Sequence, residues 1–192
     1  MIPSSERRKI ISHTREMVEM IRVSARSKIK LKNNIVLGGD RPLIAVPVIG
    51  STESEFIDNL REAASHSPDL LELRVDYLKP LTREILQSIV RFAKKFDIPV
   101  LVTNRTRREG GASEQDEDRR VELLVEACSM GIEAVDIELS TPKNLLEHLL
   151  ERARGAGVKV IISYHNFEGT PGEEDIVSIA RAEEQAGADV LK

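Results

Sequence analysis

The sequence is poor in aromatic residues: Phe, Trp and Tyr make up 3% of its 192 residues, and Trp is absent. The core must therefore be aliphatic, and the sequence offers no aromatic surface on which nucleic-acid bases or sugars could stack. Cys128 is the only cysteine. A single cysteine excludes a disulfide framework and a thiolate metal cluster, and it favours a reducing compartment.

Long apolar runs are also missing. No stretch approaches the ~18 residues that a membrane span needs, and the first residues lack the apolar region of a signal peptide. We therefore expect a cytoplasmic protein without membrane contact. The remaining composition, with 41% hydrophobic and 31% charged residues, is typical of one globular domain with a substantial core.

The N-terminal region is basic, although the whole chain has a formal net charge of −4. Residues 4–26 carry apolar side chains at helical spacing, so we assign residues 1–27 to a basic amphipathic helix. A solvated helix face with mixed charges is favoured there over a surface for nucleic acid. Two short β-prone runs follow, and the intervening Asn33 and Asn34 tolerate left-handed conformations, which predicts a small hairpin.

From Leu43 onward, a short apolar run, a polar loop and an amphipathic stretch recur every ~25 to 35 residues, which is the βα repeat of a parallel sheet. The predicted strands are Leu43–Ile49, Asp69–Val75, Ile98–Thr103, Glu133–Leu139, Val158–Tyr164 and Ala188–Leu191. Residues 28–192 are thus expected to form one βα domain.

Helix starts are predicted independently of the strands. Thr52 with Glu55 forms a capping box, and Thr141 is an expected cap with Pro142 as the first helical residue. The segment 113–120, SEQDEDRR, is interpreted as a solvated helix start without a further role.

Charged residues alternate along three of the predicted strands, and this pattern separates two architectures. Glu72, Arg74 and Asp76 share one face of their strand, as do Thr103 with Arg105 and Asp136 with Glu138. Under a helix layer of an open sheet such charges would be costly unless they were paired. In a (β/α)8 barrel they converge near the carboxyl rim, where they can pair with one another and with a polar ligand. We therefore favour the barrel over a doubly wound sheet.

Motifs for several other chemistries are absent. The sequence has neither a phosphate-binding GxxxxGK[ST] nor a GxGxxG after the first strand, which disfavours nucleotide binding. The four histidines are scattered and do not have metal-ligand spacing. Gly110 and Gly111 suggest a loop whose backbone comes close to another group.

Two residues at predicted strand ends could carry chemistry. His165 follows the buried run Val158–Ile162 directly, and the carboxyl end of a buried strand is where α/β proteins build their sites. Lys192 ends the motif GADVLK, which could project an amine from a barrel wall into an apolar pocket. Desolvation and nearby cations there would lower the amine pKa enough for attack on a carbonyl. A structural histidine and an ordinary surface lysine are the alternatives.

The chain resembles type I 3-dehydroquinate dehydratase of the shikimate pathway from about Lys28 to Lys192. The resemblance rests on five motifs in order, which are LELRVDYL, VTNRTRREGG, VDIELS, IISYHNFEGTP and GADVLK. It implies a (β/α)8 barrel that converts 3-dehydroquinate to 3-dehydroshikimate and water, without a metal or organic cofactor.

The resemblance also implies a role for each matching residue. Lys192 would form the Schiff base, His165 would be the general base and acid, and Glu109 would orient His165. Glu72, Arg74 and Arg105 match the family's ligands for the substrate hydroxyls. Members of this family are commonly homodimers, so the resemblance favours a homodimer. The one further partner it implies is the small-molecule substrate.

Two departures from the family pattern stand out. Asn166 replaces the usual Asp after the histidine. The sequence also stops at Lys192, with six βα strands where a barrel of about 250 residues has eight, so we expect a working dehydratase with a further C-terminal part beyond Lys192. The alternatives are a truncated, non-catalytic barrel protein that needs a partner, and a class I aldolase that uses a similar lysine imine.

Overall fold

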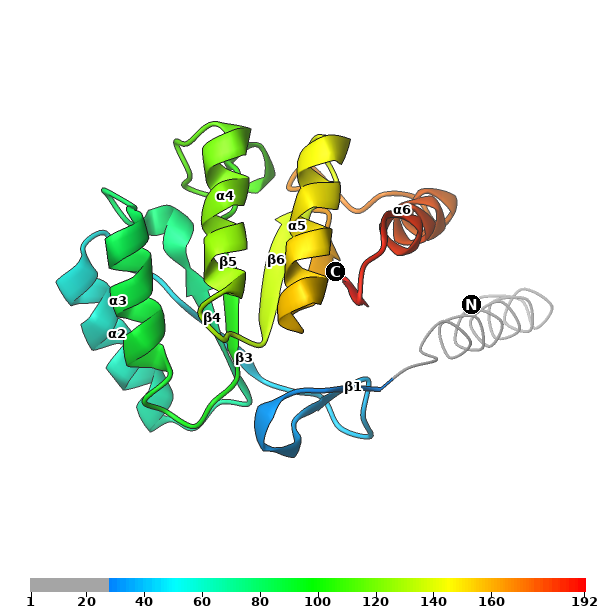
Figure 1. The fold of residues 1–192 in the computed structure, drawn as a ribbon. Coiled ribbons are helices and arrows are strands. Elements are labelled where there is room, and N and C mark those ends of the chain that lie inside the picture. The colour runs from blue at the N-terminus through cyan, green and yellow to red at the C-terminus, as the bar shows by residue number, and fades with distance from the viewer. Residues whose placement is uncertain (1–27) are drawn as a thin grey trace, which may run out of the picture. The chain divides into compact units, whose positions relative to one another are not determined.

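The computed structural model of the chain describes residues 28–192 (Figure 1). The predicted amphipathic helix over residues 1–27 lies outside the described residues. The predicted hairpin is confirmed as a small unit of two antiparallel strands, β1 (Ile29–Lys30) and β2 (Val36–Leu37). Asn33 and Asn34 adopt the expected left-handed conformation, with φ values of 57° and 61°. A 3-10 turn, η1 (Lys32–Asn34), lies between the two strands in the sequence.

The remaining strands form one parallel sheet in sequence order, β3-β4-β5-β6-β7-β8. Their bounds are β3 (Ala45–Val48), β4 (Leu70–Arg74), β5 (Val100–Thr103), β6 (Ala134–Glu138), β7 (Lys159–Ser163) and β8 (Val190–Leu191). All six predicted strands are therefore confirmed. No pairing between β3 and β8 occurs within the described part of the chain, so this sheet is the open, six-stranded part of a barrel-type fold.

A helix follows each strand from β3 to β7. The α-helices are α2 (Glu53–Ser65), α3 (Arg83–Ala93), α4 (Glu117–Cys128), α5 (Lys143–Ala156) and α6 (Glu173–Ala186), and two further 3-10 turns are η2 (Val75–Tyr77) and η3 (Arg107–Glu109). Figure 1 shows α2 to α5 ranged along one side of the sheet. The hydrophobic core fills the space between this helix layer and the sheet, and its members include Phe56, Leu73, Leu86 and Leu124.

The other face of the sheet changes character along the strands. Near the amino ends it is apolar, where Leu70, Leu101, Ala134 and Ile161 form a second cluster that Leu31 packs against. Toward the carboxyl ends the residues on the same face are polar, because side chains two positions apart point the same way. This face of the sheet therefore has an apolar layer near the amino ends of the strands and a polar layer near their carboxyl ends.

Two predicted helix starts have different outcomes. Thr52 caps α2 by accepting a hydrogen bond from the Glu55 backbone N–H, as predicted. Glu55 itself accepts from the backbone N–H and the hydroxyl of Ser51, one residue earlier than in a capping box. The prediction for α5 was wrong: Pro142 is the cap residue and Lys143 the first helical residue. The Thr141 side chain does not cap the helix, because it is buried and accepts a hydrogen bond from Arg120.

Candidate active site

The polar layer centres on Arg105, which follows β5 and has a side chain only 4% exposed. Its guanidinium donates hydrogen bonds to Asp136 Oδ1 at 2.7 Å, Ser163 Oγ at 2.7 Å and Glu138 Oε1 at 3.1 Å. These acceptors come from β6 and β7, the two next strands of the sheet. The expectation that alternating charges would meet and pair near the carboxyl rim is therefore confirmed for these strands.

Lys192 extends this layer from the end of β8. Its Nζ atom donates to Asp136 Oδ2 at 2.9 Å and lies 3.6 Å from Glu72 Oε1. Its side chain is 40% exposed. The expected apolar surroundings of the amine were wrong, because two carboxylates flank it directly. A cation does lie nearby, since Arg105 binds the same Asp136 carboxylate. Asp136, which Arg105 and Ser163 also hold, fixes the direction of the amine.

His165 and Glu109 meet at the same rim from different loops. Glu109 Oε2 accepts a hydrogen bond from the His165 backbone N–H at 3.0 Å and lies 3.4 Å from the His165 Nδ1 atom. Ser140 donates its hydroxyl to Glu109 Oε1 at 2.6 Å. Burial opposes ionisation of Glu109, but the hydrogen bonds from His165 and Ser140 outweigh it and hold the pKa of the carboxyl below its ordinary value. The structure thus brings the two residues together as predicted.

Glu72 and Arg74 of β4 occupy the next part of the layer. Glu72 accepts a hydrogen bond from the Thr103 hydroxyl at 2.7 Å, which links β4 to β5. Arg74 binds both carboxylate oxygens of Asp76, at 2.9 and 2.8 Å. Burial alone would lower the pKa of Arg74, but the bond to Asp76 and the surrounding negative charges raise it.

The double glycine shapes the loop that carries Glu109. A Cβ atom at Gly111 would lie 2.1 Å from the Arg105 carbonyl oxygen, so only glycine fits this close approach. Gly110 has a φ of 75°, and a side chain there would collide with the ring of Phe167. The expectation that this loop backbone comes close to another group is confirmed. The loop is fastened further by the Ala112 N–H, which donates to Asp76.

Two buried charges near the rim were not predicted. Arg120, within the segment interpreted as solvated, is 1% exposed and pairs with Glu138. Glu183 of α6 is 3% exposed, and its Oε1 atom accepts no hydrogen bond from any residue between 28 and 192. Burial and the charges of Asp136 and Glu109 raise the pKa of Glu183 to about 7. The helical spacing of Arg120 from Leu124 was the available signal, because Leu124 is a core residue of α4.

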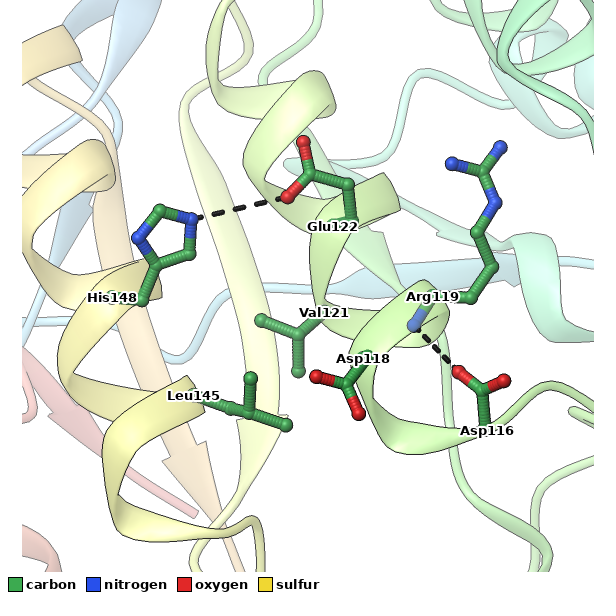
Figure 2. Close-up of a pocket in the computed structure, with 7 residues that line it drawn as sticks. All are labelled: Asp116, Asp118, Arg119, Val121, Glu122, Leu145 and His148. Carbon is green, nitrogen blue, oxygen red and sulfur yellow. Dashed lines mark hydrogen bonds and ion pairs between the residues drawn. The ribbon is translucent and has the colours of Figure 1, made fainter.

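A surface pocket between α4 and α5 contains none of the predicted site residues (Figure 2). Its lining is Asp116, Asp118, Arg119, Val121, Glu122, Leu145 and His148. Within it the imidazole of His148 lies 3.9 Å from the Glu122 carboxylate. This pocket is therefore separate from the candidate active site.

No group of three or more His, Cys, Asp or Glu side chains between residues 28 and 192 is arranged to hold a metal ion. None of the helices in that range combines the length and the apolar character needed to cross a bilayer.

Comparison with known proteins identifies the family. The sequence profile described as "Type I 3-dehydroquinase" matches residues 44–192. The chain belongs to the type I 3-dehydroquinase family. Its match covers every strand of the parallel sheet and every predicted site residue. The resemblance drawn from the five sequence motifs is therefore confirmed.

Individual members of the family are moderately similar to the chain. It is 38% identical over 158 residues to a 3-dehydroquinate dehydratase of Shouchella clausii, a match covering 79% of the chain and 61% of that protein. It is 36% identical over 165 residues to the Klebsiella pneumoniae protein of that name, a match covering 83% of the chain and 65% of that protein.

A solved structure extends the likeness to the fold. A type I 3-dehydroquinate dehydratase from Clostridium difficile, solved with covalently modified comenic acid, superposes with a TM-score of 0.82 at 30% identity. This superposition covers 87% of the chain and 67% of that structure. The match to the Shouchella clausii and Klebsiella pneumoniae 3-dehydroquinate dehydratases spans less than two thirds of the length of either protein.

Asn166 follows the histidine, where the sequence resemblance leads us to expect Asp. Asn166 Oδ1 accepts a hydrogen bond from the Glu168 backbone N–H at 2.9 Å, and its side chain is exposed. A carboxylate could accept the same bond. The replacement therefore preserves the local turn, and its side chain is engaged with its own loop.

Proposed function

We propose that the protein dehydrates 3-dehydroquinate to 3-dehydroshikimate through a Schiff base on Lys192, as a lyase of the shikimate pathway. Membership of the type I 3-dehydroquinase family supports this activity. The observation that carries the mechanism is the position of the Lys192 amine, which lies between Asp136 and Glu72 at the rim where His165 and Glu109 meet. An amine nucleophile and an oriented imidazole on one rim are the groups that imine chemistry needs.

The first stage of the reaction would join the substrate to Lys192. The neutral amine adds to the substrate ketone, and loss of water leaves an iminium that draws electrons from the adjacent carbon. Asp136 holds the Nζ atom from one side at 2.9 Å, so the amine approaches the ketone from a fixed direction. His165 would move the protons that imine formation and hydrolysis require.

The second stage would remove water from the substrate. His165 takes the proton from the carbon next to the iminium, and the electron pair passes into the imine nitrogen. When the electrons return, the hydroxyl group on the neighbouring carbon leaves and receives a proton from His165. Glu109 would orient the imidazole through Nδ1 and stabilise its positive charge, which leaves Nε2 for the substrate.

Substrate hydroxyls would be held by the polar layer of β4 and β5. Glu72 and Arg74 have side chains 14% and 19% exposed, which leaves part of each available to a ligand. Arg105 is more deeply buried, and its donors already face Asp136, Glu138 and Ser163. We infer that Arg105 and the carboxylates that it holds bind the substrate hydroxyls as one group.

Borohydride trapping tests this mechanism. The complete natural polypeptide that carries this sequence is treated with borohydride in the presence of 3-dehydroquinate, and the reduced adduct is mapped by peptide mass. We expect one adduct on Lys192, and none in Lys192→Arg. A matched control is Lys159→Arg, which changes an exposed lysine paired with Asp189 and should keep the adduct.

The outcomes separate the alternatives. Formation of 3-dehydroshikimate without any adduct would contradict the imine mechanism. An adduct with carbon–carbon cleavage would indicate a class I aldolase. No adduct and no turnover would favour a non-catalytic barrel protein that needs a partner.

We further propose that the protein works in the cytoplasm as a homodimer, with residues 28–192 in one barrel domain. A single, buried cysteine supports a reducing compartment. Light scattering of the purified polypeptide tests the dimer, because a mass equal to one chain would contradict it. Cell fractionation tests the compartment.

A further inference from the structure

Arg120 is a buried cation whose partners are all polar. Its side chain is 1% exposed, and its Nη1 atom lies 2.7 Å from Glu138 Oε2. The same guanidinium donates to the Asn104 carbonyl at 3.0 Å, to Thr141 Oγ1 at 3.0 Å and to Glu117 Oε2 at 2.6 Å. Four groups from three segments of the chain therefore share one guanidinium.

Glu138 connects Arg120 to the candidate active site. Its Oε1 atom accepts hydrogen bonds from Arg105 Nη1 at 3.1 Å and from the Thr106 backbone N–H at 3.0 Å. Its other oxygen faces Arg120. The charges alternate in sign from Arg120 through Glu138, Arg105 and Asp136 to Lys192. Without Arg120, Glu138 would keep Arg105 as its one ion-pair partner among the described residues, and the hold of Arg105 on Asp136 would weaken.

Arg120 also reaches Glu109 by two backbone routes. Through Glu138 it fixes Thr106, whose carbonyl accepts the backbone N–H of Glu109 at 3.1 Å. Through Thr141 it fixes the loop after β6, where the preceding Ser140 donates its hydroxyl to the Glu109 carboxylate. Two of the loops that hold Glu109 are therefore tied to one side chain on α4.

We propose that Arg120 is a positioning residue of the active site, which holds Glu138 and the loop after β6 so that Arg105 and Glu109 keep their contacts. This inference rests on the proposed dehydratase function. It assigns Arg120 no contact with the substrate. Its effect is to preserve the alignment of the imidazole and of the Lys192 amine, and small misalignments of reacting groups reduce rates strongly.

The test compares two adjacent arginines of α4 in the complete natural polypeptide. Arg120→Met should lower kcat roughly 10- to 100-fold at a temperature where the variant is fully folded. Arg119→Met is the matched control, because Arg119 lines the surface pocket between α4 and α5 (Figure 2) and its side chain is 42% exposed. It should leave kcat and KM within about twofold of the parent, the range expected for an exposed side chain.

The pH dependence distinguishes positioning from a general loss of stability. If the Glu109 contacts loosen, Glu109 takes up a proton at higher pH, so the acidic limb of the kcat profile should move to higher pH in Arg120→Met. Arg120→Lys keeps the charge opposite Glu138 but loses the planar fork, so it should recover part of kcat. A folded Arg120→Met with the parent's kcat, KM and acidic limb would overturn the proposal.

Two further measurements keep the test decisive. If Arg120→Met does not fold, Thr141→Val removes one Arg120 contact with little change of shape, and a kcat equal to the parent's would overturn the proposal. If the parent itself does not dehydrate 3-dehydroquinate, the proposed function fails. The positioning role is then judged from the NMR chemical shifts of the His165 imidazole at neutral pH, which should change in Arg120→Met and not in Arg119→Met.

Discussion

The Glu109→Gln substitution tests the charge at the centre of the His165 contact. Glu109 is 7% exposed and accepts three hydrogen bonds, two from His165 and one from Ser140. A glutamine can place its carbonyl oxygen toward His165 and its amide group toward Ser140, whose hydroxyl can rotate to accept. The substitution therefore preserves the number of hydrogen bonds and removes only the negative charge.

The expected loss of stability follows from this count. Hydrogen bonds to a charged group contribute about 1.5 to 3 kcal/mol and those between neutral groups about 1 kcal/mol. Part of the difference is offset because the buried carboxylate no longer has to be desolvated. We therefore expect Glu109→Gln to lower the free energy of unfolding by roughly 1 to 2 kcal/mol at neutral pH, measured by urea denaturation.

The effect on stability should depend on pH with a definite sign. Because the folded protein holds the pKa of Glu109 below its ordinary value, the carboxylate stabilises the fold above the unfolded pKa. That contribution is lost as the pH falls through the lowered, folded pKa. The difference in unfolding free energy between the parent and Glu109→Gln should accordingly shrink in acid, below the ordinary glutamate value of 4.5.

Catalysis should suffer more than stability. An imidazole without its charged partner is a weaker base, and positioned acid–base groups contribute about 10²- to 10⁴-fold to rates. We expect kcat of Glu109→Gln to fall roughly 100-fold, whereas Glu147→Gln on α5, an exposed pair with Lys143, should not change it. Parent-like kcat in Glu109→Gln, or a stability difference that does not shrink in acid, would refute the role of the Glu109 charge.

Three further predictions concern groups around the site. Gly111→Ala should lower the free energy of unfolding by about 1 to 3 kcal/mol in urea denaturation, because the new Cβ atom would collide with the Arg105 carbonyl. At Gly155 in α5 a new Cβ atom would have no neighbour within 4 Å, so Gly155→Ala should be neutral or stabilising in the same assay. The thiol of Cys128, whose pKa burial raises to about 11, should react with a thiol reagent only on unfolding. Ionisation of Glu183 is costly in the folded protein, because the folded pKa of its carboxyl is raised to about 7. Glu183→Gln should therefore stabilise the protein increasingly as the pH rises from about 4.5 to 7, by up to about 3 kcal/mol, and the gain should stay constant above pH 7.

The strands and the inner polar layer could be predicted because their signals are local. A run such as Val158–Ile162 is β-branched, and alternation along a strand assigns Asp136 and Glu138 to one face whatever lies opposite. Once parallel order is assumed, the carboxyl ends of neighbouring strands must meet. Sequence pattern and topology therefore predict that Arg105 and these carboxylates meet at one rim, without specifying the individual pairs.

The neighbours of Lys192 could not be predicted in the same way. Which charges flank a side chain at a strand end depends on the stagger between strands, and no periodic pattern within one strand reports it. Asp136 reaches the amine because β6, β7 and β8 lie next to one another in that order. The one carboxylate of the motif GADVLK, Asp189, precedes the strand, whereas Lys192 follows it. Nothing within the motif therefore argued against the expected apolar pocket.

The misreading of Arg120 and the wrong cap at Thr141 have one common cause. A charged residue in a polar helix start and a threonine before a proline each have a satisfactory local explanation, as a solvated side chain and as a cap. In the structure the two side chains satisfy each other, and Arg120 also balances Glu138 from the neighbouring strand. Burying that carboxylate requires a second cation besides Arg105, since a buried charge without a partner is costly. Arg105 is shared between Glu138 and Asp136, and of these two carboxylates Lys192 pairs with Asp136 only, so Glu138 has a cation of its own only in Arg120. Counting charges across elements therefore identifies Arg120 where periodicity within one element does not.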